Sequence, residues 1–126
     1  MLDYTELKDK GGLEEWPAMS DLPFIKVLEG DPKHYGRFDL GGFTTRTSAG
    51  VWECTEGRFE YTYPGDEIAT VLSGLIRLVD ENGTAHEYGP GDTFYTSKGE
   101  TVTWHVVEKV RKIFHIHDPA AEQLAA

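Results

Sequence analysis

The sequence predicts an all-β domain, built as a sandwich or a closed barrel. From Phe24 onward, short stretches rich in β-branched and aromatic residues recur along the chain, and such stretches favour strands. Turn-forming clusters such as Asn82-Gly83 and Gly89-Pro90-Gly91-Asp92 separate them. About ten short strands at regular spacing are typical of sandwiches and barrels. The length of 126 residues fits one domain with one core.

The elements follow in order along the chain. Residues 1–20 carry no regular pattern, and Pro17 would end any helix that forms there. We expect them to form an arm that lies on the barrel or on a partner subunit, ahead of a domain over 21–126. Asp118-Pro119 resembles an N-cap followed by proline at the first helical position, which predicts a short helix over 120–124. The predicted strands are 24–29, 43–48, 51–54, 58–63, 67–73, 75–80, 84–88, 93–97, 101–107 and 110–117.

Composition excludes several classes of protein. The formal charge of −10 repels phosphate backbones and anionic lipid, so we expect no nucleic-acid partner and no membrane partner. No apolar run approaches the roughly 18 to 20 residues that a membrane span needs. Residues 1–10 have mixed charges and do not read as a secretory signal. Cys54 is the only cysteine, which excludes an internal disulfide and a thiolate zinc cluster. A cytoplasmic location is the simplest expectation.

Two groups of residues resemble known sequence motifs. Glu67 and Gly74 have six residues between them, and Gly91 and Gly99 have seven. Both spacings are similar to the signature motifs of the cupin superfamily, whose members are jelly-roll β-barrels. Further features over 43–116 are similar to the subgroup that contains the cupin domain of (S)-ureidoglycine aminohydrolase and the ethanolamine-utilisation cupins. They are Trp52 with Cys54, Asp66-Glu67, Val71-Leu72-Ser73-Gly74, Gly91-Asp92, Trp104 and Arg111-Lys112.

The metal site that this resemblance implies is largely missing. A conventional cupin site uses three histidines and one glutamate on the barrel interior. In this chain the histidine positions fall on Tyr61, Tyr63 and Val102, and only Glu67 remains. We therefore expect no conventional metal site and no cofactor. The alternative is a divalent or ferric transition metal held by Glu67 with Tyr61 or Tyr63; tyrosine can ligate ferric iron but is a poor ligand for divalent ions at neutral pH.

Strand alternation predicts what lines the interior. Side chains two residues apart share a face, so Glu67 implies a common inner face for Ala69, Val71 and Ser73. The corresponding sets on the other strands are Phe59, Tyr61 and Tyr63; Val102, Trp104 and Val106; and Val110, Lys112, Phe114 and Ile116. A small barrel encloses its own side chains or one small ligand. The candidate ligand-binding residues are Tyr61, Tyr63, Glu67, Trp104 and Lys112, together with Trp52 and Cys54 of the tryptophan–cysteine strand.

Two charged residues fall on this inner face. An isolated buried charge costs several kcal/mol, so we expect Glu67 and Lys112 to pair, or both to contact a polar ligand. The alternative is that Lys112 extends to the rim and Glu67 accepts a hydrogen bond from a tyrosine. Glu67 is also the candidate acid–base group, should the protein be an enzyme.

The remaining chemistry-bearing residues have plainer interpretations. Cys54 is a candidate nucleophile, but a lone strand cysteine is more often a small packed hydrophobe. His115 and His117 lie on one face of a predicted strand and could chelate a metal, yet that face is opposite the apolar one and points outward. His105 lies opposite Trp104, and His34 and His86 lie near turns and are interpreted as surface residues.

Three functions are compatible with these residues. The first is a protein that binds a small polar or nitrogen-containing metabolite in an aromatic pocket without a conventional cupin metal site. The second, implied by the resemblance, is an aminohydrolase-like enzyme of ureide, amino-acid or amine metabolism that uses Glu67 as its acid–base group, with or without a weakly held metal. The third is a non-catalytic structural or regulatory dimer. Cupins commonly dimerise, so a homodimer is expected in each case.

Overall fold

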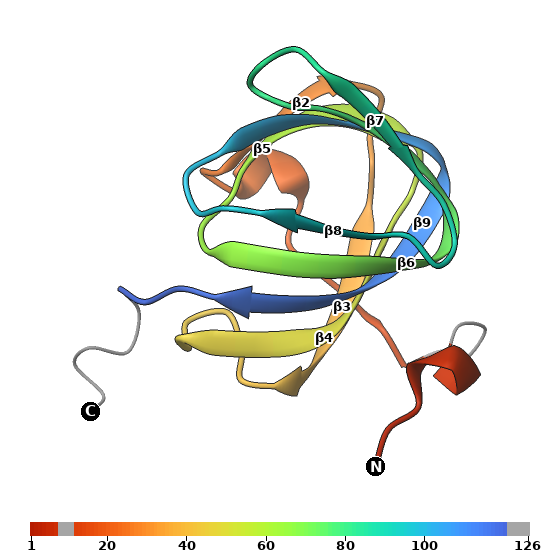
Figure 1. Cartoon of the computed structure of the whole chain (residues 1–126), viewed down its shortest axis with the longest axis vertical. Helices are drawn as coiled ribbons and strands as arrows, with labels where there is room; N and C mark the ends of the chain where they lie inside the picture. Colours follow the sequence, from red (N-terminus) through yellow and green to blue (C-terminus); the bar gives the residue numbers. More distant parts are fainter. Residues whose placement is uncertain (8–11, 121–126) are drawn as a thin grey trace.

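One antiparallel sheet curls around a central core in the computed structural model, which describes residues 1–7 and 12–120 (Figure 1). Within these residues the sheet has nine strands and is accompanied by two short 3-10 helices, η1 (Tyr4–Leu7) and η2 (Met19–Asp21). The strands are β1 (Glu14–Glu15), β2 (Ile25–Glu29), β3 (His34–Leu40), β4 (Thr47–Cys54), β5 (Gly57–Thr62), β6 (Asp66–Val79), β7 (Ala85–Tyr88), β8 (Thr93–Thr96) and β9 (Thr101–His117). An all-β barrel was predicted, and the curled sheet confirms it.

The longest strands, β6 and β9, form the centre of the sheet. The first half of β9 pairs with β5 and the second half with β4, while β6 pairs along nearly all of β9. The sequence predicted two separate strands in place of β6 and two in place of β9, and this was wrong. The register between β6 and β9 shifts around Gly74, which has a φ of 92°. Glycine tolerates this backbone conformation, so β6 bends there without ending.

The first part of the sheet departs most from the prediction. Residues 43–46 were expected to begin a strand but form turns and bends, and β4 starts only at Thr47. From there β4 runs without a break through Ala49-Gly50, where a gap between strands was predicted. Strand β3 was not predicted at all, because glycine and charged residues dilute its pattern; it pairs with β4, and Gly36 lies opposite Trp52.

The core lies inside the curl and is formed by the inward faces of the strands. The alternation predicted for β6 is confirmed for Glu67, Ala69 and Val71, all of which are buried. Ser73 is only half-buried, because the register shift near Gly74 interrupts the alternation. The main apolar cluster contains Trp52, Cys54, Phe59, Tyr63, Val71, Ile76, Leu78, Val102, Trp104, Val106, Val110 and Phe114.

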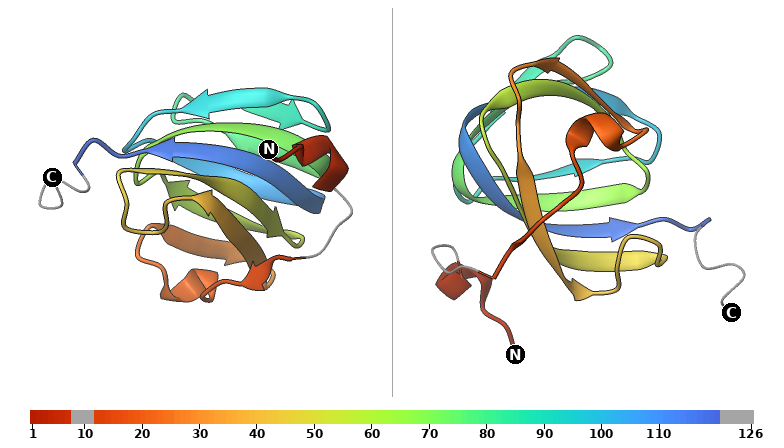
Figure 2. Two further views of the ribbon diagram at one scale, coloured as in Figure 1. Left: turned by 90° about the horizontal axis from the view of Figure 1, so that it is seen from below. Right: turned by 180° about the vertical axis from the view of Figure 1, so that it is seen from behind.

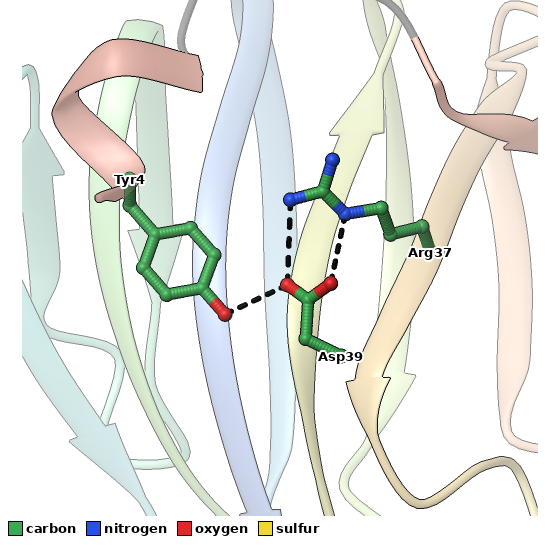
Figure 3. Close-up of polar contacts among 3 residues, drawn as sticks. All are labelled: Tyr4, Arg37 and Asp39. Atoms are coloured by element: carbon green, nitrogen blue, oxygen red, sulfur yellow. Dashed lines mark hydrogen bonds and ion pairs between the residues drawn. The ribbon is translucent and has the colours of Figure 1, made fainter. Parts of the chain in front are cut away.

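The N-terminal segment lies against its own barrel, where it crosses β3 (Figure 2). The Trp16 ring stacks on Phe38, with 5.2 Å between ring centroids, and Met19 belongs to the core cluster. Further out, the Tyr4 hydroxyl donates a hydrogen bond of 2.8 Å to Asp39, which also accepts one from Arg37 (Figure 3). The segment thus contributes to the core, and the boundary at residue 20 stays a prediction.

Gly36 makes room for this arm. A Cβ at this position would overlap the Trp16 indole, so Gly36→Ala is expected to push the indole away from β3. We expect a loss of about 1–3 kcal/mol in the free energy of unfolding, as is typical of overpacking, and faster amide exchange in β1. Urea denaturation and hydrogen exchange measure the two effects. Gly42→Ala is the matched control, because a Cβ there meets open space. Equal behaviour of the two variants would contradict the expectation.

Two further predictions concern helices: a short one at 120–124 and the absence of one that spans a membrane. The Asp118 side chain accepts a hydrogen bond of 3.0 Å from the Ala120 amide in a turn. The helix predicted over 120–124 is not shown, since 121–124 lie outside the described residues. Among the residues that are described, no helix has the length and apolarity to cross a membrane.

Candidate ligand pocket

A cavity of about 400 Å³ opens into the barrel interior. The inward faces of β3, β4, β5, β6 and β9 form most of its wall, and the N-terminal arm contributes Trp16 and Pro17. A cavity of this volume is in the range of small-molecule sites, which are concave and mostly apolar. Its aromatic lining residues are Trp16, Phe24, His34, Phe38, Phe43, Trp52, Phe59, Tyr61, Trp104 and Phe114.

Glu67 and Lys112 form an ion pair in the wall of this cavity. The Lys112 ammonium donates a hydrogen bond of 2.5 Å to a Glu67 carboxylate oxygen. Glu67 is 3% exposed and Lys112 is 4% exposed. They are not opposite each other in the sheet: Glu67 faces Ile116, and Lys112 faces Val71. Both extended side chains therefore reach along the inner face to meet. The predicted pairing is confirmed, and the extension of Lys112 to the rim was the wrong alternative.

Two indole rings flank the Lys112 ammonium. Its nitrogen lies 4.8 Å from the centroid of a Trp52 ring and 4.9 Å from that of Trp104. Trp52 occupies the position directly opposite Lys112 on β4, which fixes this arrangement through the strand register. Aromatic faces attract cations, and the attraction grows where water is excluded. The ammonium is thus held by one carboxylate and two aromatic faces.

The two tyrosines at the cupin histidine positions have different roles. Tyr61 lines the cavity, whereas Tyr63 packs in the core and its hydroxyl accepts a hydrogen bond of 3.2 Å from the Trp104 indole. Burial raises the pKa of both hydroxyls above the usual value, and the nearby Glu67 carboxylate adds to the effect. Both are therefore neutral at physiological pH.

Cys54 belongs to the core rather than to the cavity wall. It is fully buried, and its thiol donates a 3.3 Å hydrogen bond to the Thr55 carbonyl. Burial raises the pKa of the Cys54 thiol to about 12, so the thiolate that a nucleophile needs is not populated at neutral pH. This favours the packed-hydrophobe interpretation over catalysis.

His34 is a lining residue that sequence reasoning missed. It was predicted to lie on the surface, and this was wrong: it is 5% exposed. The Trp52 indole N–H can only donate, so Nδ1 of His34 accepts its hydrogen bond at 3.1 Å. Nε2 then carries the proton and donates to the Pro17 carbonyl at 2.6 Å. His34 thus links the arm to Trp52, and recognition of β3 would have placed it on the inner face.

This arrangement predicts a loss of stability in mild acid. Burial lowers the pKa of His34 below its ordinary 6.5, so the folded protein keeps the ring neutral where the unfolded chain protonates it. The unfolded state then binds more protons, and the free energy of unfolding falls as pH decreases from 6.5 toward the lowered pKa. The contribution to the slope is at most about 1.4 kcal/mol per pH unit.

Urea titrations between neutral and mildly acidic pH measure this slope. His34→Gln removes the titrating group and is expected to flatten the slope, whereas His115→Gln, at an exposed position, leaves it unchanged. An unchanged slope in His34→Gln would show that other groups account for it.

The other histidines lie on the outside. His115 is exposed on the outer face of β9, and Nδ1 of His117 lies 3.1 Å from the Thr47 hydroxyl. His105 is half-buried on the same outer face, and His86 pairs with Asp80 at 2.9 Å. Over residues 1–7 and 12–120, no three histidine, cysteine or carboxylate side chains lie together in a way that could hold a metal ion.

The residues present do not fit the metal that the cupin fold implies. Glu67 already holds the Lys112 ammonium. A metal ion bound to Glu67 would have to displace this ammonium, or lie beside it and be repelled by its charge. The tyrosines at the histidine positions are neutral hydroxyls, which are poor ligands for divalent ions. The interior cation in this site is an amine of the chain itself.

Comparison with known proteins agrees with this architecture. The model of the EutQ-like cupin domain matches residues 41–114. The EutQ protein of Clostridium difficile is 22% identical with a TM-score of 0.60, covering 72% of this chain and 66% of its own. A DUF861 family protein of Thermotoga maritima is 29% identical with a TM-score of 0.51, covering 52% and 75%. Another DUF861 protein, from Pseudomonas syringae, is 20% identical with a TM-score of 0.73, covering 85% and 45%.

The curled antiparallel sheet and the matched residues define a cupin. More than half of the chain fits one family model, so the protein belongs to the EutQ-like cupin family. The chain spans just under two thirds of the C. difficile EutQ protein. No curated protein matches it. The likeness to the aminohydrolase in particular stays a prediction.

Proposed function

We propose that the protein binds a small metabolite with a polar or nitrogen-containing group inside the barrel, without a conventional cupin metal site. The observation that carries this proposal is the cavity of about 400 Å³ with aromatic walls and the Glu67–Lys112 pair. Because the two charges neutralise each other, the walls favour a ligand with an apolar or planar body. Glu67, Tyr61 and Ser48 offer polar contacts to its remaining group.

The names of similar structures support the nitrogen-containing class. One solved relative is described as an ethanolamine utilization protein of Salmonella typhimurium, and it is 21% identical over 70% of this chain. Ethanolamine is a small amine, and the Tyr61 and Ser48 hydroxyls among the lining residues can exchange hydrogen bonds with such a group. Larger amines, amides and ureides fill more of the cavity and are expected to bind more tightly than ethanolamine itself.

Thermal denaturation with a panel of these compounds tests the proposal. We expect at least one compound to raise the melting temperature saturably, as a ligand of the native state does. Ser48→Leu, which fills the cavity from β4, is expected to abolish the shift. Ala49→Leu, on the opposite face of the same strand, is the matched control and keeps it. A shift that survives Ser48→Leu would place binding elsewhere, and no shift with any compound would contradict the proposal.

A second candidate is an enzyme that uses Glu67 as its acid–base group. The observation that favours it is a buried carboxylate at the cavity wall, within hydrogen-bond distance of a proton donor. Turnover of an amine or ureide with a bell-shaped pH profile, abolished in Glu67→Gln, supports it. Elemental analysis of the purified protein distinguishes an enzyme that uses Glu67 together with a metal from a metal-free binding protein. A stoichiometric transition metal would overturn the metal-free proposal.

We keep homodimerisation as part of the proposal. Trp16 and Met19 pack against the barrel of their own chain, so we expect the contacts between subunits to use other surfaces. Analytical ultracentrifugation of the full chain measures its oligomeric state. A monomer at micromolar concentration would overturn this part without affecting ligand binding.

A further inference from the structure

Lys112 is unlike the other lysines that the structure describes. Lys26, Lys33, Lys98 and Lys109 are exposed, whereas Lys112 is buried and is one of the residues that line the cavity. A lysine amine next to an acid–base group is a recognised nucleophile toward carbonyl compounds, with which it forms Schiff bases. A structural ion pair needs no adjoining cavity, but this one lies in the wall of a space large enough for a ligand.

Glu67 supplies the acid–base partner that such chemistry needs. Its carboxylate lies 2.5 Å from the amine, within the distance at which a proton passes directly. Transfer of one proton from Lys112 to Glu67 converts a buried ion pair into an uncharged amine and an uncharged acid.

We propose that Lys112 forms a reversible imine with an aldehyde or ketone bound in the cavity, with Glu67 moving the protons. This inference rests on the proposed function, because it requires that the cavity accept a small molecule. It names carbonyl compounds as one class of ligand and adds a covalent step to binding.

The step balances without an added reactant. Glu67 takes a proton from the ammonium, and the nitrogen lone pair attacks the carbonyl carbon. The carbonyl oxygen takes up a proton from Glu67, which gives a carbinolamine. The nitrogen of this carbinolamine carries two protons and a positive charge. Glu67 takes one of these protons and passes it to the hydroxyl, which leaves as water while the nitrogen lone pair forms the C=N bond; the second proton stays on the nitrogen and gives a protonated imine. One carbonyl compound and one amine give one imine and one water, and nothing is oxidised or reduced.

The surroundings of the amine also suit the product. A protonated imine keeps a positive charge on the Lys112 nitrogen, where Glu67 and the faces of Trp52 and Trp104 already stabilise a cation. The same contacts that hold the free ammonium therefore serve the adduct. The ligand's carbon skeleton would extend from this nitrogen into the aromatic cavity.

Reductive trapping tests the inference on the full chain. The protein is incubated with benzaldehyde and sodium cyanoborohydride at pH 7, and the benzylated lysine is located by peptide mass spectrometry. We expect Lys112 to be labelled at least tenfold faster than any exposed lysine. Glu67→Gln is expected to slow the labelling of Lys112 at least tenfold, whereas Lys26→Arg, on the exposed side of β2, leaves it unchanged. The wild-type map decides the site of reaction even if a variant at position 112 does not fold.

Benzyl alcohol separates this inference from the proposed function, because it has a similar shape but no carbonyl group. A saturable thermal shift with benzyl alcohol, together with benzaldehyde labelling spread over the exposed lysines, would overturn the imine and keep the pocket. Absence of both the shift and Lys112 labelling would count against the pocket, and the imine would fall with it. Selective labelling of Lys112 supports both.

Discussion

Lys112→Met is expected to lower the free energy of unfolding by about 3–5 kcal/mol, because it leaves the Glu67 carboxylate buried without its partner. Glu67 lies in the cavity wall with its oxygen on the Lys112 ammonium, and both residues are buried. Removing one member of such a pair costs far more than the pair itself contributes, since the remaining charge stays desolvated. Urea denaturation at neutral pH measures the loss.

Two companion variants make this result specific. In Glu67→Leu/Lys112→Met both charges are absent, and we expect most of the lost stability to return, because apolar residues of similar size replace a buried pair at little cost. Lys109→Met removes an exposed lysine that lies 3.6 Å from Glu53, and it is expected to cost under about 1 kcal/mol. If Lys112→Met were as stable as the wild type, this would contradict the expectation: the Glu67 carboxylate would then be hydrated or protonated in the variant with no loss in the free energy of unfolding.

Trp104→Ala is expected to cost about 3–5 kcal/mol, the usual range for deleting a large buried aromatic side chain. Trp104 is 1% exposed, and its ring lies nearly parallel to Phe59, with 5.8 Å between centroids. It also contacts the Trp52 ring edge to face and donates a hydrogen bond to the Tyr63 hydroxyl. The deletion therefore removes packing, a polar contact and one of the two faces beside Lys112.

Trp104→Phe is the control that separates these contributions. It keeps most of the packing but not the indole N–H, so the Tyr63 hydroxyl is left with its Thr96 contact alone. We expect a loss of about 1–2 kcal/mol, in the range of an incompletely satisfied buried polar group. Equal losses in the alanine and phenylalanine variants would contradict the role given to packing, and differential scanning calorimetry or urea denaturation distinguishes the two.

Several features of the site could be predicted from strand alternation, once the resemblance to the cupin motif had placed Glu67 on the inner face. Glu67, Trp104 and Lys112 each lie on strands with clear periodicity, and a buried charge on one predicted a partner on another. The structure brings these three together. Tyr61 also lines the cavity as expected, whereas Tyr63 and Cys54 share its inner face but pack deeper in the core.

The rest depends on contacts that local patterns do not record. Gly36 weakens β3 as a sequence signal because it accommodates Trp16, a residue twenty positions earlier, so both the strand and the lining residue His34 were missed. Gly74 was interpreted as a strand boundary, yet the pairing of β6 with β9 carries the strand through it. In each case tertiary packing overrides a local preference.

The position of β9 in the sheet has a consequence for the order in which the chain acquires its structure. Among the described strands β9 comes last, and it alone joins β4, β5 and β6. Without it the sheet separates into three small groups: β1 with β3 and β4, β2 with β5, and β6 with β7 and β8. Small groups of strands with open edges are marginally stable in water and prone to pair with other chains. During synthesis the barrel therefore cannot close before residue 117 is free to pair, and the net charge of −10 helps to keep the waiting chain soluble.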